Sequence, residues 1–168
     1  MIHVCSLQAM PSEAARLGPT HLISILDPED YAETPGGVDP ARHWRFGFND
    51  ISEPEPDQLM PEQADIERLL KFGDGWDGVA VTLIHCFAGI SRSTAAALIL
   101  ICQRNAGREL EAAERLRSAG QHAWPNRRMI EFADGLLGCD GRMVDALRVL
   151  PMPPSFDVDE TISLAAAL

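Results

Sequence analysis

The sequence predicts a single α/β domain in which a central, largely parallel sheet is flanked by helices. In the first half of the chain, short aliphatic segments alternate with longer helical patterns, whereas only helical patterns occur between residues 109 and 150. The length of 168 residues suits one domain, and an apolar fraction of 46% provides for a sizeable core. We therefore expect the sheet to form from the early segments and helices to cover its faces.

Four segments have the composition of strands. His21–Leu26 is a short aliphatic run that ends at Asp27-Pro28, as expected of a buried parallel strand. Residues 43–48 alternate aromatic and polar side chains, and residues 79–84 form a second apolar run. Residues 2–7 are suited to an opening or edge strand. We expect the run 79–84 to be the central strand.

Six segments are typical of helices, and several have clear end signals. Pro61 suits the first turn of the second helix, and the glycines of residues 73–78 stop it. The segment after the central strand is almost entirely small and apolar, which indicates a buried helix. Glu111 and Arg115 form an i,i+4 pair on a solvated face. The predicted helices are residues 12–17, 62–72, 91–105, 109–119, 127–137 and 141–150.

The domain is predicted to span residues 1–150. Pro151, Pro153 and Pro154 close it, and we expect residues 151–168 to be a loose C-terminal tail. Neither a signal peptide nor an apolar run of the roughly 18 to 20 residues needed to cross a bilayer is found, so the sequence predicts a soluble protein.

Composition argues against several classes of function. With 14 basic and 25 acidic residues the net charge is −11, so neither nucleic acid nor an anionic membrane is expected as a partner. The four cysteines, Cys5, Cys86, Cys102 and Cys139, are scattered and form no C-x-x-C pair, which indicates neither a metal site nor a disulfide framework. Reduced thiols and a cytoplasmic location are therefore predicted, with no cofactor.

One loop combines a thiol and a guanidinium at a spacing that suits phosphate. Cys86 and Arg92 are separated by five residues between the predicted central strand and the buried helix. In such a loop the backbone N–H groups of residues 87–92 can point inward, next to the positive end of the helix dipole. Arg92 could then hold two oxygens of a phosphate while Cys86, as thiolate, attacks the phosphorus. The alternative is that Cys86 is a buried structural cysteine.

The segment around this loop resembles a known catalytic signature. His85, Cys86, Gly89, Arg92 and Ser93 match the His-Cys-x5-Arg-Ser/Thr pattern of cysteine-dependent protein tyrosine phosphatases. The similarity is greatest to the compact dual-specificity branch and to its small bacterial members. It implies the protein tyrosine phosphatase-like fold, a metal-independent mechanism through a phosphocysteine, and phosphate, sulfate and vanadate as ligands.

The resemblance also assigns roles to individual residues. It implies that Ser93 assists departure of the thiolate, that His85 orders the loop, and that the backbone of Phe87, Ala88, Gly89, Ile90, Ser91 and Arg92 binds phosphate. Such phosphatases take a general-acid aspartate from a loop upstream, and Asp50, 36 positions before Cys86 and just after a predicted strand, occupies that place.

Some assignments leave alternatives open. Asp50 could instead cap a turn beside Asn49, and Asp57 and then Asp39 are rival acids. Asn126, in a Pro-Asn pair that resembles an element of the same branch, is either a site residue or an ordinary turn residue. A competing function is an inactive module that binds phosphate or phosphoproteins without cleaving them.

The loop also bears on the substrate. Its variable positions, Phe87, Ala88, Ile90 and Ser91, carry no charge, whereas enzymes acting on inositol phosphates tend to have lysines there. An uncharged rim favours a monophosphorylated group, either phosphotyrosine on a protein or a small aryl phosphate, and is compatible with dual specificity.

Overall fold

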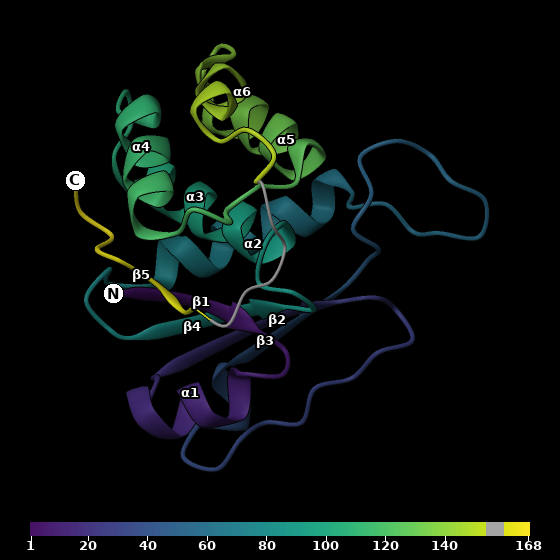
Figure 1. Ribbon diagram of the computed structural model, residues 1–168, viewed down its shortest axis with the longest axis vertical. Coiled ribbons are helices and arrows are strands. Elements are labelled where there is room, and N and C mark those ends of the chain that lie inside the picture. Colours follow the sequence, from purple (N-terminus) through teal and green to yellow (C-terminus); the bar gives the residue numbers. More distant parts are fainter. Residues whose placement is uncertain (154–159) are drawn as a thin grey trace.

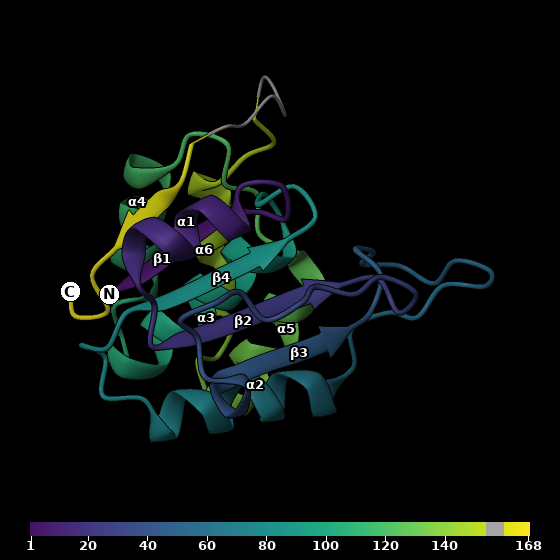
Figure 2. The ribbon, with the colours of Figure 1, turned by 90° about the horizontal axis from the view of Figure 1, so that it is seen from below.

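The computed structural model describes residues 1–153 and 160–168, and it contains a five-stranded sheet in the order β3-β2-β4-β1-β5. Strands β1 (Ile2–Ser6), β2 (His21–Leu26), β3 (His43–Gly47) and β4 (Thr82–Cys86) are parallel to their neighbours, and β5 (Ile162–Leu164) runs antiparallel to β1. Figure 2 shows the strands side by side with β4 in the middle. The predicted fold class, a largely parallel sheet between helices, is confirmed.

Helices cover both faces of the sheet unequally. Of the six α-helices in the described residues, α1 (Met10–Leu17) lies on one face and the other five lie on the opposite face (Figure 1). These five are α2 (Gln63–Gly75), α3 (Arg92–Arg104), α4 (Glu109–Ala119), α5 (Arg127–Leu137) and α6 (Arg142–Ala146). Helix α3 is packed directly on the central strands, and α2, α4 and α5 surround it. Two short 3-10 helices, Pro40–Arg42 and Leu147–Val149, complete the helical elements of the described residues.

The alternation of side chains along each strand creates a core on each face. On β2, Ile23 and Ile25 belong to the large cluster that includes α3, whereas Leu22 and Leu26 belong to a smaller cluster beneath α1. Successive residues of a strand point to opposite faces, so a fully buried aliphatic strand supplies both clusters. Helix α3 is buried from Arg92 to Cys102, as its small apolar composition predicts.

The expectation of a loose C-terminal tail is wrong for the residues after 159. Strand β5 pairs with β1, and Ile162, Leu164 and Ala166 are buried in the large core. Three residues are enough to form this strand, which covers the edge of β1, because the two apolar side chains, Ile162 and Leu164, are buried against α4. Residues 154–159, also assigned to the tail, lie outside the described residues.

The parallel arrangement brings several loops to one edge of the sheet. Strands β2, β3 and β4 all end there, followed by Asp27, the segment 48–62 and the loop 87–91 respectively. This edge is where the carboxyl ends of parallel strands place functional groups in open α/β folds. Within the described residues, no helix is long and apolar enough to cross a membrane.

Candidate active site

The loop between β4 and α3, residues 87–91, is held by hydrogen bonds to its outward-facing carbonyls. The amide of Leu7 donates to the Phe87 carbonyl at 3.0 Å, and that of Trp124 donates to the Ile90 carbonyl at 3.0 Å. The amide of Asn126 donates to the Ser91 carbonyl at 3.3 Å. With these carbonyls engaged outside, the loop can turn N–H groups inward, where the N-terminus of α3 adds its positive dipole.

Gly89 is required at the point where this loop passes strand β1. Its φ angle is +77°, and a Cβ atom there would lie 2.7 Å from the carbonyl carbon of Cys5. Both the left-handed backbone and the close approach exclude a side chain. The geometry lets the Gly89 amide donate to Sγ of Cys86 at 3.3 Å.

Cys86 is the last residue of β4 and lies at the floor of the loop. It is buried, and its Sγ is 3.1 Å from the hydroxyl of Ser93 in the first turn of α3. A thiolate at this point would have a donor from Ser93 and another from the Gly89 amide. The structure thus brings Cys86, Ser93 and Gly89 together, as the signature implies.

Arg92 is buried, and its guanidinium is anchored at one end only. Both hydrogens of Nη1 are used, one by the Asp27 carboxylate at 2.6 Å and one by the Phe48 carbonyl at 2.7 Å. Nε is buried and has no hydrogen-bond partner within the described residues. A buried donor without a partner is costly, so the Nε edge of the guanidinium is ready to bind an oxyanion.

Asp27 is a site residue that the sequence prediction missed. Its carboxylate fixes the orientation of Arg92 from the end of β2. The sequence position of Asp27 could have indicated this role, because Asp27 directly follows a predicted buried parallel strand. The carboxyl ends of parallel strands meet at one edge of the sheet, where functional groups gather. Recognising it would have required knowing that β2 lies beside β4.

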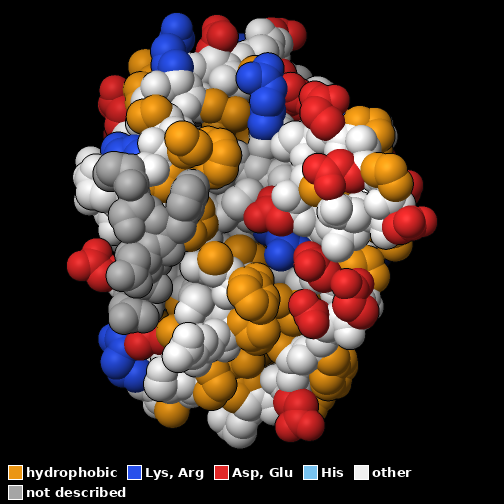
Figure 3. All heavy atoms as spheres, turned by 45° about the vertical axis from the view of Figure 1, so that its right-hand side comes forward, with side chains coloured by type: hydrophobic (Ala, Val, Ile, Leu, Met, Phe, Trp, Pro, Cys, Tyr) orange, Lys and Arg blue, Asp and Glu red, His pale blue; other side chains and the backbone are white. Residues whose placement is uncertain are grey.

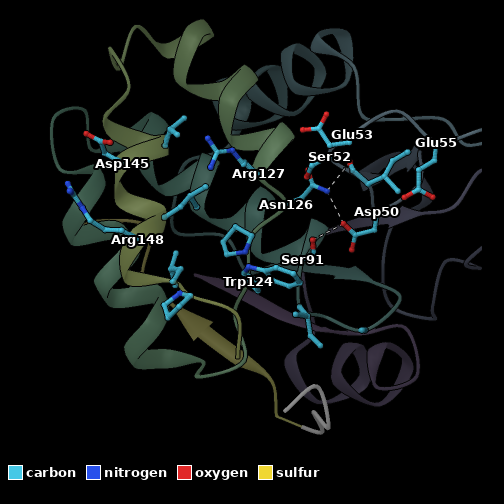
Figure 4. A pocket seen from close by; sticks show the side chains of 18 residues that line it. Asp50, Ser52, Glu53, Glu55, Ser91, Trp124, Asn126, Arg127, Asp145 and Arg148 are labelled. Atoms are coloured by element: carbon cyan, nitrogen blue, oxygen red, sulfur yellow. Dashed lines mark hydrogen bonds between the residues drawn. The ribbon is translucent and has the colours of Figure 1, made fainter. Parts of the chain in front are cut away.

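Asp50 lies beside the loop and is tied to it through one carboxylate oxygen. Its Oδ1 accepts hydrogen bonds from the Ser91 hydroxyl at 2.7 Å and from Nδ2 of Asn126 at 2.9 Å (Figure 4). Its Oδ2 is 3.8 Å from Nε of Arg92. Asn126 also caps α5 by accepting from the Met129 amide, so it has a structural role and a contact to Asp50 at once.

The rival aspartates occupy different environments. Asp39 accepts a hydrogen bond from the amide of Ala41 and begins a short 3-10 helix. Asp57 is an exposed turn residue with a φ angle of +60°. No hydrogen bond or ion pair connects either carboxylate with Arg92 or Cys86 in the part of the chain that the structure describes, so the geometry favours Asp50.

His85 is completely buried behind the loop. Its Nδ1 is 3.3 Å from the carbonyl oxygen of Cys86, and its Nε2 is 2.6 Å from the hydroxyl of Ser24. Burial is the main cause that lowers the pKa of His85 to about 4, so the ring is neutral at physiological pH. A neutral imidazole that donates to a backbone carbonyl can order the loop, whereas it cannot reach substrate from this depth.

A cavity of about 1100 Å³ opens beside the loop. It extends from Asp50 and Ser91 past Trp124 to α6 and the 3-10 helix that follows, with Arg148 on the far side (Figure 4). On this side of the molecule a hollow is flanked by hydrophobic side chains and, along one margin, by acidic ones (Figure 3). At the loop itself, Phe87 is 65% exposed while Ile90 is buried.

The donor set does not form a metal centre. Among the described residues there is no group of three or more His, Cys, Asp or Glu side chains arranged to hold a metal ion. The groups near Cys86 are a guanidinium, hydroxyls and backbone amides, which suit an oxyanion.

Comparison with known proteins connects this arrangement with one fold. No protein-family model matches the chain, and no curated protein sequence matches it. The structure of human DUSP28 is similar with a TM-score of 0.62 at 18% identity, covering 82% of this chain and 94% of that one. The chain has the dual-specificity phosphatase fold.

Two further structures with the dual-specificity phosphatase fold support this assignment. DUSP15 is similar with a TM-score of 0.64 at 17% identity, covering 88% of this chain and 86% of its own. The human tyrosine phosphatase-like serine/threonine/tyrosine-interacting protein has a TM-score of 0.62 at 19% identity, covering 83% and 92%. The resemblance that the signature around Cys86 indicates is therefore confirmed for the fold.

Proposed function

We propose that the protein is a phosphomonoester hydrolase that acts through a phosphocysteine at Cys86. The observation that carries this proposal is the meeting at Cys86 of two hydrogen-bond donors, from Ser93 and Gly89, beside the buried guanidinium of Arg92. Nε of this guanidinium has no hydrogen-bond partner within the described residues. A thiolate nucleophile next to an oxyanion cradle is the arrangement that phosphoryl transfer to sulfur requires.

The first step transfers the phosphoryl group from substrate to sulfur. The Cys86 thiolate attacks phosphorus, the bond between phosphorus and the leaving oxygen breaks, and Asp50 gives its proton to that oxygen. The hydrogen bonds that Oδ1 accepts from Ser91 and Asn126 support this role, because they leave Oδ2 to carry the proton. Arg92 and the loop amides hold the remaining phosphate oxygens.

The second step returns the enzyme to its starting state. Water attacks the phosphocysteine, its proton passes to the Asp50 carboxylate, and inorganic phosphate leaves as the sulfur–phosphorus bond breaks. The Ser93 hydroxyl, 3.1 Å from Sγ, stabilises the thiolate as it departs. Atoms and charge balance without a metal or cofactor.

The surroundings of the loop favour an aryl phosphate, such as phosphotyrosine in a protein. Phe87 is exposed in the loop and Trp124 is 43% exposed along the cavity, so apolar surface is available for an aromatic ring or a peptide. Glu53 and Glu55 line the same cavity, and their negative charge disfavours a substrate with several phosphates. We also propose a cytoplasmic location, because the mechanism needs the free thiol that Cys86 presents.

The alternative, a phosphate-binding module without turnover, has one observation in its favour. A similar structure is that of a protein named as phosphatase-like and as an interacting protein, so the fold is not restricted to proteins named as phosphatases. In this chain Cys86, Arg92 and Asp50 are all present and assembled, which favours catalysis.

The test is hydrolysis of p-nitrophenyl phosphate and of a phosphotyrosine peptide by the purified, reduced protein. We expect turnover with both substrates, a phosphorylated Cys86 trapped by acid quenching and detected by mass spectrometry, and no turnover by Cys86→Ser. Binding of the phosphopeptide without release of phosphate would overturn the hydrolase and establish the binding module instead.

A further inference from the structure

A continuous chain of hydrogen bonds crosses the face of the sheet opposite α3 and ends at the backbone of Cys86. The two ring nitrogens of His85 form the inner links of this hydrogen-bond network. Nε2 is 2.6 Å from Oγ of Ser24, and Nδ1 is 3.3 Å from the carbonyl oxygen of Cys86. On its other side, Oγ of Ser24 is 2.7 Å from Nε2 of His43. The central part of the chain is buried, because Ser24, His43 and His85 are at most 7% exposed.

The outer end of the chain lies on the segment between β2 and β3. Nδ1 of His43 is 2.8 Å from Oγ1 of Thr34, and Thr34 accepts a hydrogen bond of 2.8 Å from Nη2 of Arg45. The guanidinium of Arg45 also contacts the Ala32 carbonyl and lies over the ring of Tyr31. Arg45 is therefore held in place by the segment that carries Thr34.

The sheet register explains why these residues meet. Ser24 is aligned with His85 on β4 and with Arg45 on β3, and Leu22 is aligned with His43. Residues aligned across neighbouring strands share a face of the sheet, so Arg45, Ser24 and His85 form one row across three strands. His43, two positions before Arg45, lies on the same face and is a diagonal neighbour of Ser24. The member of this row on β4, His85, directly precedes Cys86.

The direction of every hydrogen bond in the chain follows from its inner end. The Cys86 carbonyl can only accept, so Nδ1 of His85 carries the proton and Nε2 of the neutral ring must accept. Ser24 therefore donates its single hydrogen to His85 and has to accept from Nε2–H of His43. The Nδ1 atom of neutral His43 is then an acceptor.

The outer end is compatible with this direction. Arg45 can only donate, so Thr34 accepts from it and is free to donate its hydroxyl hydrogen to Nδ1 of His43. Both histidines are neutral in this arrangement, and burial, as the largest cause, lowers the pKa of each to about 4. The two imidazoles must hold opposite tautomers, Nδ1–H in His85 and Nε2–H in His43.

We propose that Ser24, His43 and Thr34 are positioning residues of the active site, which hold His85 in the Nδ1–H tautomer so that it keeps the Cys86 carbonyl turned away from the phosphate cradle. This inference rests on the proposed role of Cys86 as nucleophile. The Cys86 carbonyl is then held in the same way as the carbonyls of Phe87, Ile90 and Ser91, which accept hydrogen bonds from residues outside the loop. Without its donor, the carbonyl dipole of Cys86 is free to turn toward the thiolate and oppose it.

The tautomers can be measured directly in the wild-type chain. Long-range ¹H–¹⁵N correlation spectra at pH 7 distinguish a protonated from an unprotonated ring nitrogen in each histidine. We expect His85 as the Nδ1–H tautomer and His43 as the Nε2–H tautomer. The same tautomer in both rings, or a positively charged ring in either, would overturn the proposal whether or not the protein hydrolyses phosphate.

A matched pair of substitutions tests the consequence for Cys86. Ser24→Thr keeps the hydroxyl. Ser24→Val introduces a side chain of nearly the same shape as threonine but without the hydroxyl. We expect Ser24→Val to lower both kcat on p-nitrophenyl phosphate and the rate of Cys86 alkylation by iodoacetamide at pH 6 by about tenfold, with KM within about twofold of wild type, because only the thiolate reacts. Ser24→Thr should restore both rates.

The other thiols do not interfere with the alkylation measurement. Burial raises the pKa of Cys5 to about 12 and that of Cys139 to about 11, and it also raises the pKa of Cys102. Equal alkylation rates in folded Ser24→Val and Ser24→Thr would refute the positioning role. A wild-type protein that shows the predicted tautomers and alkylation but no turnover would refute the hydrolase proposal alone.

Discussion

At the scale of single residues, two carboxylates approach Arg92 with different consequences. Asp27 contacts Nη1 at 2.6 Å, an ion pair that leaves its carboxylate committed to orienting the guanidinium. Asp50 approaches Nε at the longer distance of 3.8 Å and is about one third exposed toward the cavity. Of the two, only Asp50 lines the cavity beside Ser91, which supports the proposal that Asp50 exchanges a proton with the substrate.

Asp50→Asn tests this distinction. We expect kcat on phenyl phosphate, whose leaving group is poor, to fall by about two to four orders of magnitude, because the amide cannot protonate the leaving oxygen. The fall on p-nitrophenyl phosphate should be smaller, since its leaving group needs less help. Steady-state kinetics with both substrates provide the measurement.

Asp57→Asn is the matched control, because Asp57 is an exposed carboxylate of the same segment without a described contact to the loop. It should retain the wild-type kcat on both substrates. Activity retained by Asp50→Asn and lost by Asp57→Asn would show that the other carboxylate is the acid.

At the scale of elements, the conformation of the loop 87–91 depends on its close contact with β1. The loop leaves β4 at Cys86 and enters α3 at Arg92, and Gly89 passes against the backbone of Cys5 between them. The amides therefore have their positions because β1 supports the loop from one side and Trp124 and Asn126 support it from the other.

Gly89→Ala should displace this loop. The new Cβ would meet the Cys5 backbone at 2.7 Å in a residue whose φ is +77°, so the loop has to move. We expect kcat/KM on p-nitrophenyl phosphate to fall at least about 100-fold, because a shift of 1 Å in an active site costs about that much. The free energy of unfolding should fall by about 1 to 3 kcal/mol.

Gly135→Ala provides the control for this substitution. Gly135 lies in helix α5, and a Cβ there meets no atom within 4 Å. Alanine should raise the stability by up to about 1 kcal/mol and leave kcat/KM unchanged. Wild-type activity in Gly89→Ala would contradict the assignment of the loop as the phosphate cradle.

The same elements explain what the sequence could predict. Cys86, Arg92 and Ser93 are close in the chain, so their spacing on one strand-loop-helix unit was enough to predict their meeting. The role of Asp27 depends on β2 lying next to β4, which no local pattern specifies. Ser24 and His43 were missed for the same reason, because their partners come from neighbouring strands.

Strand β5 was missed for a different reason. Its three residues, Ile162–Leu164, are too few to show a periodic pattern, and only the unpaired edge of β1 and the cover provided by α4 make them a strand. The contact is close, since a Cβ at Gly120, just after α4, would lie 2.4 Å from the side chain of Ile162. Tertiary contacts decide the structure of such a short segment.

At the scale of the whole molecule, acidification has two opposite effects on stability. The net charge of −11 becomes less negative as carboxylates are protonated, which relieves repulsion in the compact state. The buried histidines act in the other direction. His43 and His85 have pKa values lowered to about 4 by burial, so the unfolded chain takes up protons near pH 6.5 while the folded protein does not.

The histidine effect can be isolated with His43→Gln, whose amide can still donate and accept. Between pH 6.5 and 4.5 the unfolded state of the wild type binds more protons than the folded state, so the free energy of unfolding falls as pH is lowered. The contribution of His43 over this interval is about 2 kcal/mol, because each pH unit corresponds to about 1.4 kcal/mol per proton. In His43→Gln this contribution is absent, while the carboxylates and the other histidines titrate as before. Urea unfolding at several pH values should therefore show a shallower loss of stability in the variant, and parallel curves for the two proteins would mean that His43 is not buried as a neutral ring.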